Sequence, residues 1–265
     1  MSATGIHAPP PSPLRQVAVM LEDGATHAVL QAAAELAQML NVDLSGWFVE
    51  DARLLELAQF PFAREADWTS ATLRPLQAAS LERALRLAAQ SAERQWREAM
   101  RRFGVAASFR AVRESPQRQL LRLTREFSVV VFGPRRAWPT GQARASMPAT
   151  ARPLVVVIEA QHAMPQGVEL AARWAAQRRR PLHLIWSGSA VTPQAEQTEA
   201  IVAYLSESGI GFAAQMTARS PQAVEDALRH AQPEGVILSA VHELAQPDRL
   251  RSLAALLRCP VVLVR

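Results

Sequence analysis

The stretch RESPQRQLLRL (residues 113–123) shares its Ser-Pro-Gln tripeptide with ARSPQAVEDAL (residues 218–228). In both places a strand-like run precedes the tripeptide, and a helix-like pattern and then an apolar run follow it. Ser115 and Ser220 can cap a helix, because their hydroxyls can accept hydrogen bonds from its first free amides. Pro116 and Pro221 suit the first helical position. The repeat therefore predicts one strand-to-helix corner present in two copies of one domain.

Strand-like and helix-like segments alternate along the whole chain. In the first half, apolar runs at 16–21, 44–50, 107–112 and 128–133 are separated by helical stripes at 29–40, 81–103 and 116–127. The second half has strands at 152–160, 181–187, 211–218, 235–240 and 259–265 and helices at 167–179, 193–208, 221–230 and 248–257. This alternation predicts an α/β fold of two tandem Rossmann-like domains, each a mainly parallel sheet flanked by helices.

The two halves are predicted to be unequal copies. Moving the first half forward by 139 positions lays Val17 on Val156 and Trp47 on Trp186 without a gap. Between residues 133 and 153 there is neither helical periodicity nor a strand run, so the first copy is predicted to lack its closing helix and fifth strand. We expect a proline-rich lead-in at 1–14, a first domain at 15–145 and a second at 146–265.

Composition and charge narrow the classes of function. The net charge is +5, but the chain has no lysine, and its arginines are interleaved with acids, which indicates a salt-bridged surface and no nucleic-acid binding. No apolar run approaches the ~20 residues of a membrane helix, and the N-terminus lacks the pattern of a signal peptide. A single cysteine, Cys259, fits a reducing compartment. These features predict a cytoplasmic protein without a membrane segment.

The last strand and its lead-in, RLRSLAALLRCPVVLVR (residues 249–265), resemble the universal stress protein family, most clearly in Cys-Pro-Val at Cys259–Val261. GWFVED and VVVFGP, at the ends of two earlier strands, and the order of elements repeated twice add to the resemblance. The resemblance covers most of the chain beyond Leu14. It implies a regulatory or binding protein with an internal pseudo-dimer, and a homo-oligomer or a protein partner.

Members of this family either bind ATP or do not. The ATP binders place glycines after the fourth strand in the pattern Gly, two residues, Gly, nine residues, Gly-Ser or Gly-Thr, and the glycine amides approach the phosphates. Here Gly133 is followed by Pro134, which has no amide N–H, and the next glycine, Gly141, comes too late. In the second copy Val241 and Arg251 stand where the later glycines would be.

The positions that could still contact a nucleotide are few. They are Asp23 after the first strand, Val49 at the end of the second, Gly133, and Ser252, which matches the last residue of the glycine pattern in the second copy. We expect no strong ATP binding and no resident cofactor, and a non-enzymatic function. The alternative is an ATP- or AMP-binding member with a divergent phosphate loop and at most slow hydrolysis.

The sequence has few signals for metal binding, catalysis or binding of nucleic acid. The six histidines have no metal-ligand spacing, so no metal site is predicted, and no motif of a catalytic nucleophile or phosphate loop is present, so no catalytic residue is predicted. An adenylyl-transfer enzyme would need a phosphate loop near the first strand, and binding of nucleic acid through arginines would weaken steeply with salt. The apolar connection at 52–78 is interpreted as a flap packed over helices, or else as a lid on a small-molecule pocket or a partner surface.

Overall fold

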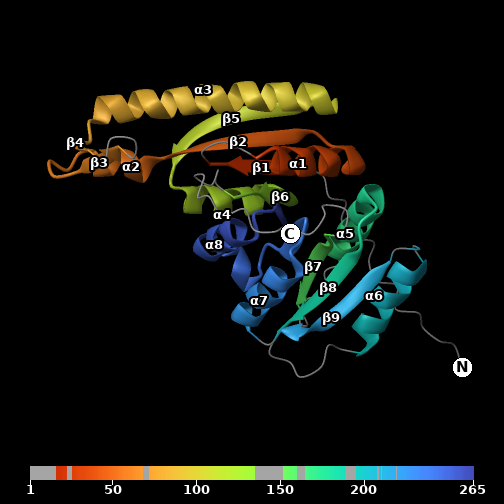
Figure 1. The fold of residues 1–265 in the computed structure, drawn as a ribbon. Coiled ribbons are helices and arrows are strands. Elements are labelled where there is room, and N and C mark those ends of the chain that lie inside the picture. The colour runs from red at the N-terminus through yellow and green to blue at the C-terminus, as the bar shows by residue number, and fades with distance from the viewer. Residues whose placement is uncertain are drawn as a thin grey trace, which may run out of the picture.

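The computed structural model describes residues 16–22, 26–67, 72–134, 152–159, 165–188, 195–207, 209, 211–218 and 220–265. Its main sheet has nine strands in the order β5-β2-β1-β6-β11-β10-β7-β8-β9 (Figure 1). Their bounds are β1 Val17–Leu21, β2 Leu44–Asp51, β5 Ala107–Glu114, β6 Val129–Phe132, β7 Leu154–Glu159, β8 Leu182–Ser187, β9 Phe212–Ala218, β10 Gly235–Ser239 and β11 Val261–Val264. A separate antiparallel hairpin consists of β3 Arg64–Asp67 and β4 Thr72–Pro75.

Helices cover both faces of the main sheet. One face packs against α1, α3, α5 and α6, and the other against α4, α7 and α8. The helices are α1 His27–Leu40, α2 Ala52–Leu57, α3 Ala78–Phe103, α4 Pro116–Glu126, α5 Pro165–Arg178, α6 Ala195–Glu207, α7 Pro221–Ala231 and α8 Pro247–Leu257, with a short 3₁₀ helix η2 at Glu243–Ala245. The sheet is thus buried between two helical layers, which explains why its central strands are apolar on both faces. The predicted α/β class is confirmed.

The repeated Ser-Pro-Gln corner forms as predicted. The Ser115 hydroxyl accepts a hydrogen bond from the Arg118 amide at 3.4 Å, and Ser220 accepts from the Ala223 amide at 3.2 Å. In both copies the proline occupies the first turn of the helix. The cap and the proline therefore begin α4 and α7 at equivalent places in the two halves.

The two halves share one continuous sheet (Figure 1). Strand β11, the last of the chain, pairs in parallel with β10 and antiparallel with β6, with Val261 opposite Phe132 and Val264 opposite Val129. The last strand of the second half therefore lies where a fifth strand of the first half would lie. The predicted boundary at residue 145 falls outside the described residues and stays a prediction.

A polar network on α1 and α5 also joins the halves. Glu35 accepts hydrogen bonds from the Trp174 indole at 2.9 Å, from Arg178 Nε at 2.6 Å and from Gln31 at 2.9 Å. Arg178 extends the network to Glu234, before β10. Trp174 stands 139 residues after Glu35, which is the offset that relates the two halves. Positions related by the 139-residue offset thus face each other, and their side chains are complementary, a donor on Trp174 and an acceptor on Glu35.

The connection between β2 and α3 contains regular structure that its sequence did not predict. Helix α2 packs against α3, and the β3–β4 hairpin lies near the N-terminal end of α3 (Figure 1). Phe60 and Phe62 stack with ring centroids 5.5 Å apart, yet they are 49% and 77% exposed. Helix α2 thus contacts α3 but has no buried residue, and the interpretation as a packed flap is wrong for Phe60 and Phe62, which form an exposed surface. Trp68 lies outside the described residues.

Candidate functional site

The strand order defines two crevices where a ligand could bind. In an open parallel sheet, ligands bind outside the carboxyl ends of the strands where the strand order reverses. In the first half this point lies between β1 and β6, and in the second half between β7 and β10. Because β6 and β11 are antiparallel, the two crevices lie at opposite edges of the sheet.

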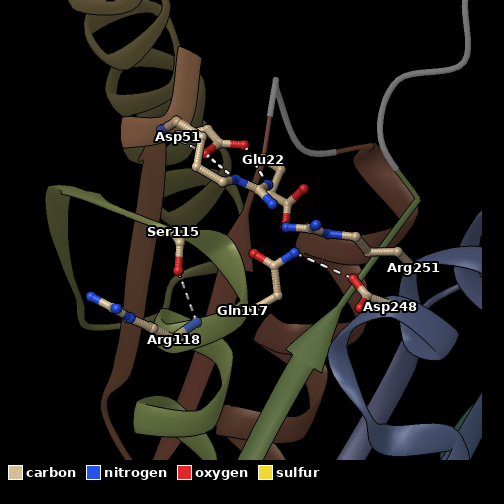
Figure 2. Close-up of polar contacts among 8 residues, drawn as sticks. Glu22, Asp51, Ser115, Gln117, Arg118, Asp248 and Arg251 are labelled. Atoms are coloured by element: carbon tan, nitrogen blue, oxygen red, sulfur yellow. Dashed lines mark hydrogen bonds and ion pairs between the residues drawn. The ribbon is translucent and has the colours of Figure 1, made fainter. Parts of the chain in front are cut away.

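The first crevice is occupied by side chains of the protein itself (Figure 2). Arg251 of α8 donates to Glu22, directly after β1, through Nη2 at 3.0 Å and Nε at 3.3 Å. Gln117, at the start of α4, donates from Nε2 to Asp248 of α8 at 3.3 Å. Helix α8 directly precedes β11 in the chain, and β11 begins beside the end of β6. This connection explains why α8 lies close to the first crevice. A helix of the second half thus closes the crevice of the first.

A second ion pair lies at the same edge. Asp51, at the end of β2, caps α2 by accepting from the Arg53 amide, and its carboxylate pairs with the Arg53 guanidinium at 2.7 Å. The hydrogen bond from Arg53 holds the pKa of Asp51 below its usual value, against the opposing effect of burial. Figure 2 shows Glu22, Asp51 and Asp248 at this same edge of the sheet.

Gly133 is a packing residue of the first crevice. It directly follows β6, and a Cβ built on it would lie 2.1 Å from Cγ2 of Val29 on α1. The end of β6 and the first turns of α1 therefore approach so closely that only glycine fits. The contact with Val29 is therefore sufficient to explain why position 133 is glycine, and no phosphate contact is needed to explain it.

The other candidate nucleotide positions come from different elements of the fold. Val49 is buried in the core on the α4 side of the sheet and pairs with Val112 of β5. Ser252 donates its hydroxyl to the carbonyl of Asp248 at 3.1 Å, within its own helix. Asp23 lies outside the described residues. Val49 and Ser252 thus belong to the two different halves, and their roles as nucleotide contacts stay predictions.

The second crevice is bridged by a buried histidine. His242 follows β10, and its Nε2 lies 3.0 Å from the hydroxyl of Ser187 at the end of β8, across the end of β7. Its Nδ1 accepts from the Leu244 amide at 3.0 Å. Because a backbone amide can only donate, Nδ1 carries no proton, so the neutral ring is protonated at Nε2 and donates to Ser187. In this tautomer the imidazole cannot remove the proton of Ser187, and the pair is not a nucleophile with its base.

Protonation of His242 is predicted to destabilise the protein in mild acid. Burial lowers the pKa of His242, with Glu159 and Glu243 opposing that effect, and a cationic ring would lose the hydrogen bond from Leu244. The unfolded chain then binds more protons than the folded one below about pH 6.5, so stability falls as the pH falls. We expect the free energy of unfolding of His242→Gln to decline less between pH 7 and pH 5 than that of the unsubstituted protein, by up to about 1.4 kcal/mol per pH unit.

Urea unfolding followed by circular dichroism at several pH values measures this difference. The control is His230→Gln on the exposed side of α7, where the ring bonds to the carbonyl of Asp226 in its own helix. Equal pH slopes for His242→Gln and the unsubstituted protein would contradict the prediction. His183 shares the direction of the effect, because burial lowers its pKa too, and it contributes equally to both proteins in the comparison.

Other reactive groups have structural surroundings. Burial raises the pKa of the Cys259 thiol to about 12, so it stays protonated and unreactive at neutral pH. In the described ranges no three or more His, Cys, Asp or Glu side chains are grouped so that they could hold a metal ion. Nor does any described helix have the length and apolar character needed to cross a membrane.

The residues that fill the crevices were only partly visible in the sequence. Arg251 stood out because it replaces a glycine of the family pattern, but its partner Glu22 is 229 residues away. The spacing of His242 in the sequence gives no sign of a metal site, and no sequence signal pairs it with Ser187. Both contacts join loops or helices that meet only in the folded sheet.

Comparison with known proteins identifies the fold. No family model and no curated protein matches the chain. A solved universal stress protein from Archaeoglobus fulgidus DSM 4304 matches with a TM-score of 0.53 at 10% identity, over 94% of this chain and 96% of that one. A second one from Archaeoglobus fulgidus (14% identity, TM-score 0.33) covers 43% of this chain and 93% of its own. A universal stress protein family member from Burkholderia pseudomallei (14% identity, TM-score 0.33) covers 44% and 98%.

The first of these likenesses extends over nearly the whole of both chains. It shows that this chain has the fold of a universal stress protein, and it confirms at the level of fold the resemblance found in the sequence. At 10% identity the likeness is evidence for the fold, but it is not evidence for which ligand this chain binds.

Proposed function

We propose that this chain is a non-enzymatic regulatory or binding protein of the universal stress type that does not bind ATP strongly. The proposal rests on the fold together with one observation, the Arg251–Glu22 ion pair over the switch point of the first half. A cytoplasmic location is part of the proposal, and the single Cys259, which fits a reducing compartment, supports it. The alternative, binding of ATP or AMP through a divergent loop, is the competing outcome of the test below.

Electrostatics at the first crevice support this proposal. A bound triphosphate would have to separate Arg251 from Glu22, whose side chain is only 7% exposed, and leave that carboxylate facing the phosphates. Asp51 and Asp248 would add like charges. Pro134 offers no amide, and Gly133 is in close contact with Val29. Each of these features opposes a phosphate group at this edge.

The contacts of His242 in the second crevice also support the proposal that ATP does not bind strongly. The His242 ring already donates to Ser187 and accepts from Leu244, so both ring nitrogens are used. The stretch from Leu238 to Ser252 has no glycine to bring backbone amides to a phosphate. Nucleotide binding here would require the loop after β10 to rearrange.

The test is the nucleotide content of the freshly purified protein. We expect mass spectrometry after denaturation to release no stoichiometric ATP, ADP or AMP, and calorimetric titration with ATP to give a dissociation constant weaker than about 1 mM. Stoichiometric nucleotide, or micromolar binding of ATP, would overturn the proposal and establish the divergent-loop alternative. Arg251→Ala tests whether the arginine in the crevice affects ATP binding. The exposed Arg229→Ala is its control, because Arg229 pairs with Asp226 on α7, away from the crevice.

The exposed surface of the connection between β2 and α3 supports a protein partner or self-association. Leu57, Phe60, Phe62 and Leu73 are all exposed there, on a segment that has no counterpart in the second half. Apolar side chains gathered on a soluble surface mark interaction sites. A concentration-dependent oligomeric state, lost in Phe62→Ser, would distinguish self-association from binding of another protein.

A further inference from the structure

Strand β5 forms one edge of the main sheet (Figure 1). Within the described part of the chain it pairs only with β2, and none of its residues is buried. It has no proline or glycine, and its pairing with β2 is regular from Ala107 to Glu114. An exposed edge of this length presents unpaired backbone groups that can bind another strand. A further strand can therefore pair with β5.

The hydrogen bonds of β5 show which of its backbone groups point away from the sheet. Leu44 of β2 lies opposite Ala107 and donates its amide to the carbonyl of Ala106 at 3.1 Å. In a parallel pair the N–H and C=O of one residue point to the same side, and successive residues alternate between the two sides. The even-numbered residues of β5 therefore bond to β2, and the odd-numbered residues from 107 to 113 direct their N–H and C=O groups outward.

Two opposite charges on β5 form no ion pair with other described residues. Arg110 lies over the Trp47 ring, with its guanidinium carbon 5.2 Å from the ring centroid. Glu114 attracts Arg122, but that arginine pairs with Glu126 at 2.7 Å. Because side chains alternate along a strand, Arg110 and Glu114 lie on the same face, at equal distances in sequence before and after residue 112. This spacing makes the strand complementary to an antiparallel copy of itself.

The charges of β5 select one register for such pairing. With Val112 on a two-fold axis, Arg110 of each copy lies opposite Glu114 of the other, and Ala111 lies opposite Arg113. Ala111 and Arg113 direct their backbone groups outward and form the hydrogen-bonded pairs, so Arg110 and Glu114 form a non-hydrogen-bonded pair, where side chains approach most closely. Arg113 adds no unpaired charge, because acids of its own chain already bind it. An axis on Arg110 would set like charges opposite each other, and an axis on Ala111 would set Arg110 opposite Val112.

We propose that two copies of this chain associate through antiparallel pairing of their β5 strands, so that one sheet runs through both copies. The inference rests on the self-association that belongs to the proposed function and assigns it a surface, but it is independent of whether ATP binds. It leaves the exposed apolar side chains after β2 free to contact a different protein.

Sedimentation velocity of the full chain at increasing concentration tests the proposal. We expect a monomer–dimer equilibrium with a dissociation constant of about 100 μM or tighter. Ala111→Pro removes an outward N–H and no hydrogen bond to β2, and it is expected to weaken association at least about 10-fold. Ala107→Pro is the matched control: it also removes an outward N–H of β5, but it lies outside the paired residues 110–114 and should change the constant less than about 2-fold.

Charge reversal tests the register. Arg110→Glu and Glu114→Arg are each expected to weaken association at least about 10-fold, because each sets like charges opposite each other in both cross-strand pairs. An equimolar mixture of the two variants is expected to associate again, because every pair between unlike copies joins an acid with an arginine. Recovery on mixing also shows that both variants are folded.

The outcomes separate this interface from the proposed function. A protein that stays monomeric, or a dimer that Ala111→Pro and both charge reversals leave unchanged, would overturn the β5 interface. A dimer kept in Ala111→Pro but lost in Phe62→Ser would also overturn it, while supporting self-association through the connection after β2. Micromolar binding of ATP by a dimer that Ala111→Pro dissociates would overturn the proposed function and support the β5 interface.

Discussion

Replacing Trp174 with alanine is expected to lower the free energy of unfolding by about 4 kcal/mol, among the larger effects of a single core substitution. The indole is fully buried on α5, and Gly235 of β10 packs so closely beneath it that a Cβ there would lie 2.7 Å from the ring. Alanine would leave a cavity where α1, α5 and β10 meet. It would also remove the indole hydrogen bond to Glu35 and the ring that Arg178 covers at 5.3 Å.

Urea unfolding at pH 7 followed by far-ultraviolet circular dichroism measures this loss. Trp174→Phe keeps a smaller aromatic ring and removes the donor to Glu35, so it loses less volume than alanine does, and we expect a loss of about 1–2 kcal/mol. Leu87→Ala, on the exposed face of α3, is the control and should change stability by less than about 0.5 kcal/mol. A loss below 1 kcal/mol for Trp174→Ala would mean that the junction of the two halves does not depend on this residue.

Gly133→Ala is expected to lower the free energy of unfolding by about 2 kcal/mol, within the range for overpacked cores. The added methyl would lie 2.1 Å from Val29 Cγ2, with Val29 Cβ and Cγ1 also within 3.3 Å. Val29 is buried on α1, and a β-branched side chain in a helix has little freedom to turn away. The strain must therefore be relieved by moving α1 away from β6. The same denaturation experiment measures it.

A second substitution tests whether the contact itself is responsible. Val29→Ala removes the atoms that clash, so the double variant Val29→Ala/Gly133→Ala should be more stable than the sum of the single effects predicts, by at least about 1 kcal/mol. Gly211→Ala is the matched control, because a Cβ there meets nothing within 4 Å. Additive effects of the two substitutions would show that Gly133 matters for a reason other than packing.

The regular elements of both halves could be predicted because their signals are local. A serine cap contacts an amide three residues away, and a proline sets the first turn of its own helix, so Ser115 and Ser220 marked the same corner in both copies. Apolar runs such as Val17–Leu21 reflect burial on both faces of a central strand. The connection after β2 could not be predicted as well, because α2 and the hairpin strands β3 and β4 are too short for periodicity to distinguish.

Local signals were therefore enough to predict the order of elements, the two related halves, the α/β class and the departure from the glycine pattern at Gly133 and Arg251. Which segments close the two crevices depends on contacts that form when distant elements pack together. The pairing of β11 with β6, the contact of Arg251 with Glu22 and that of His242 with Ser187 each join residues more than 50 positions apart. Such contacts depend on the packing of whole elements, since the chain's local preferences act over only a few residues.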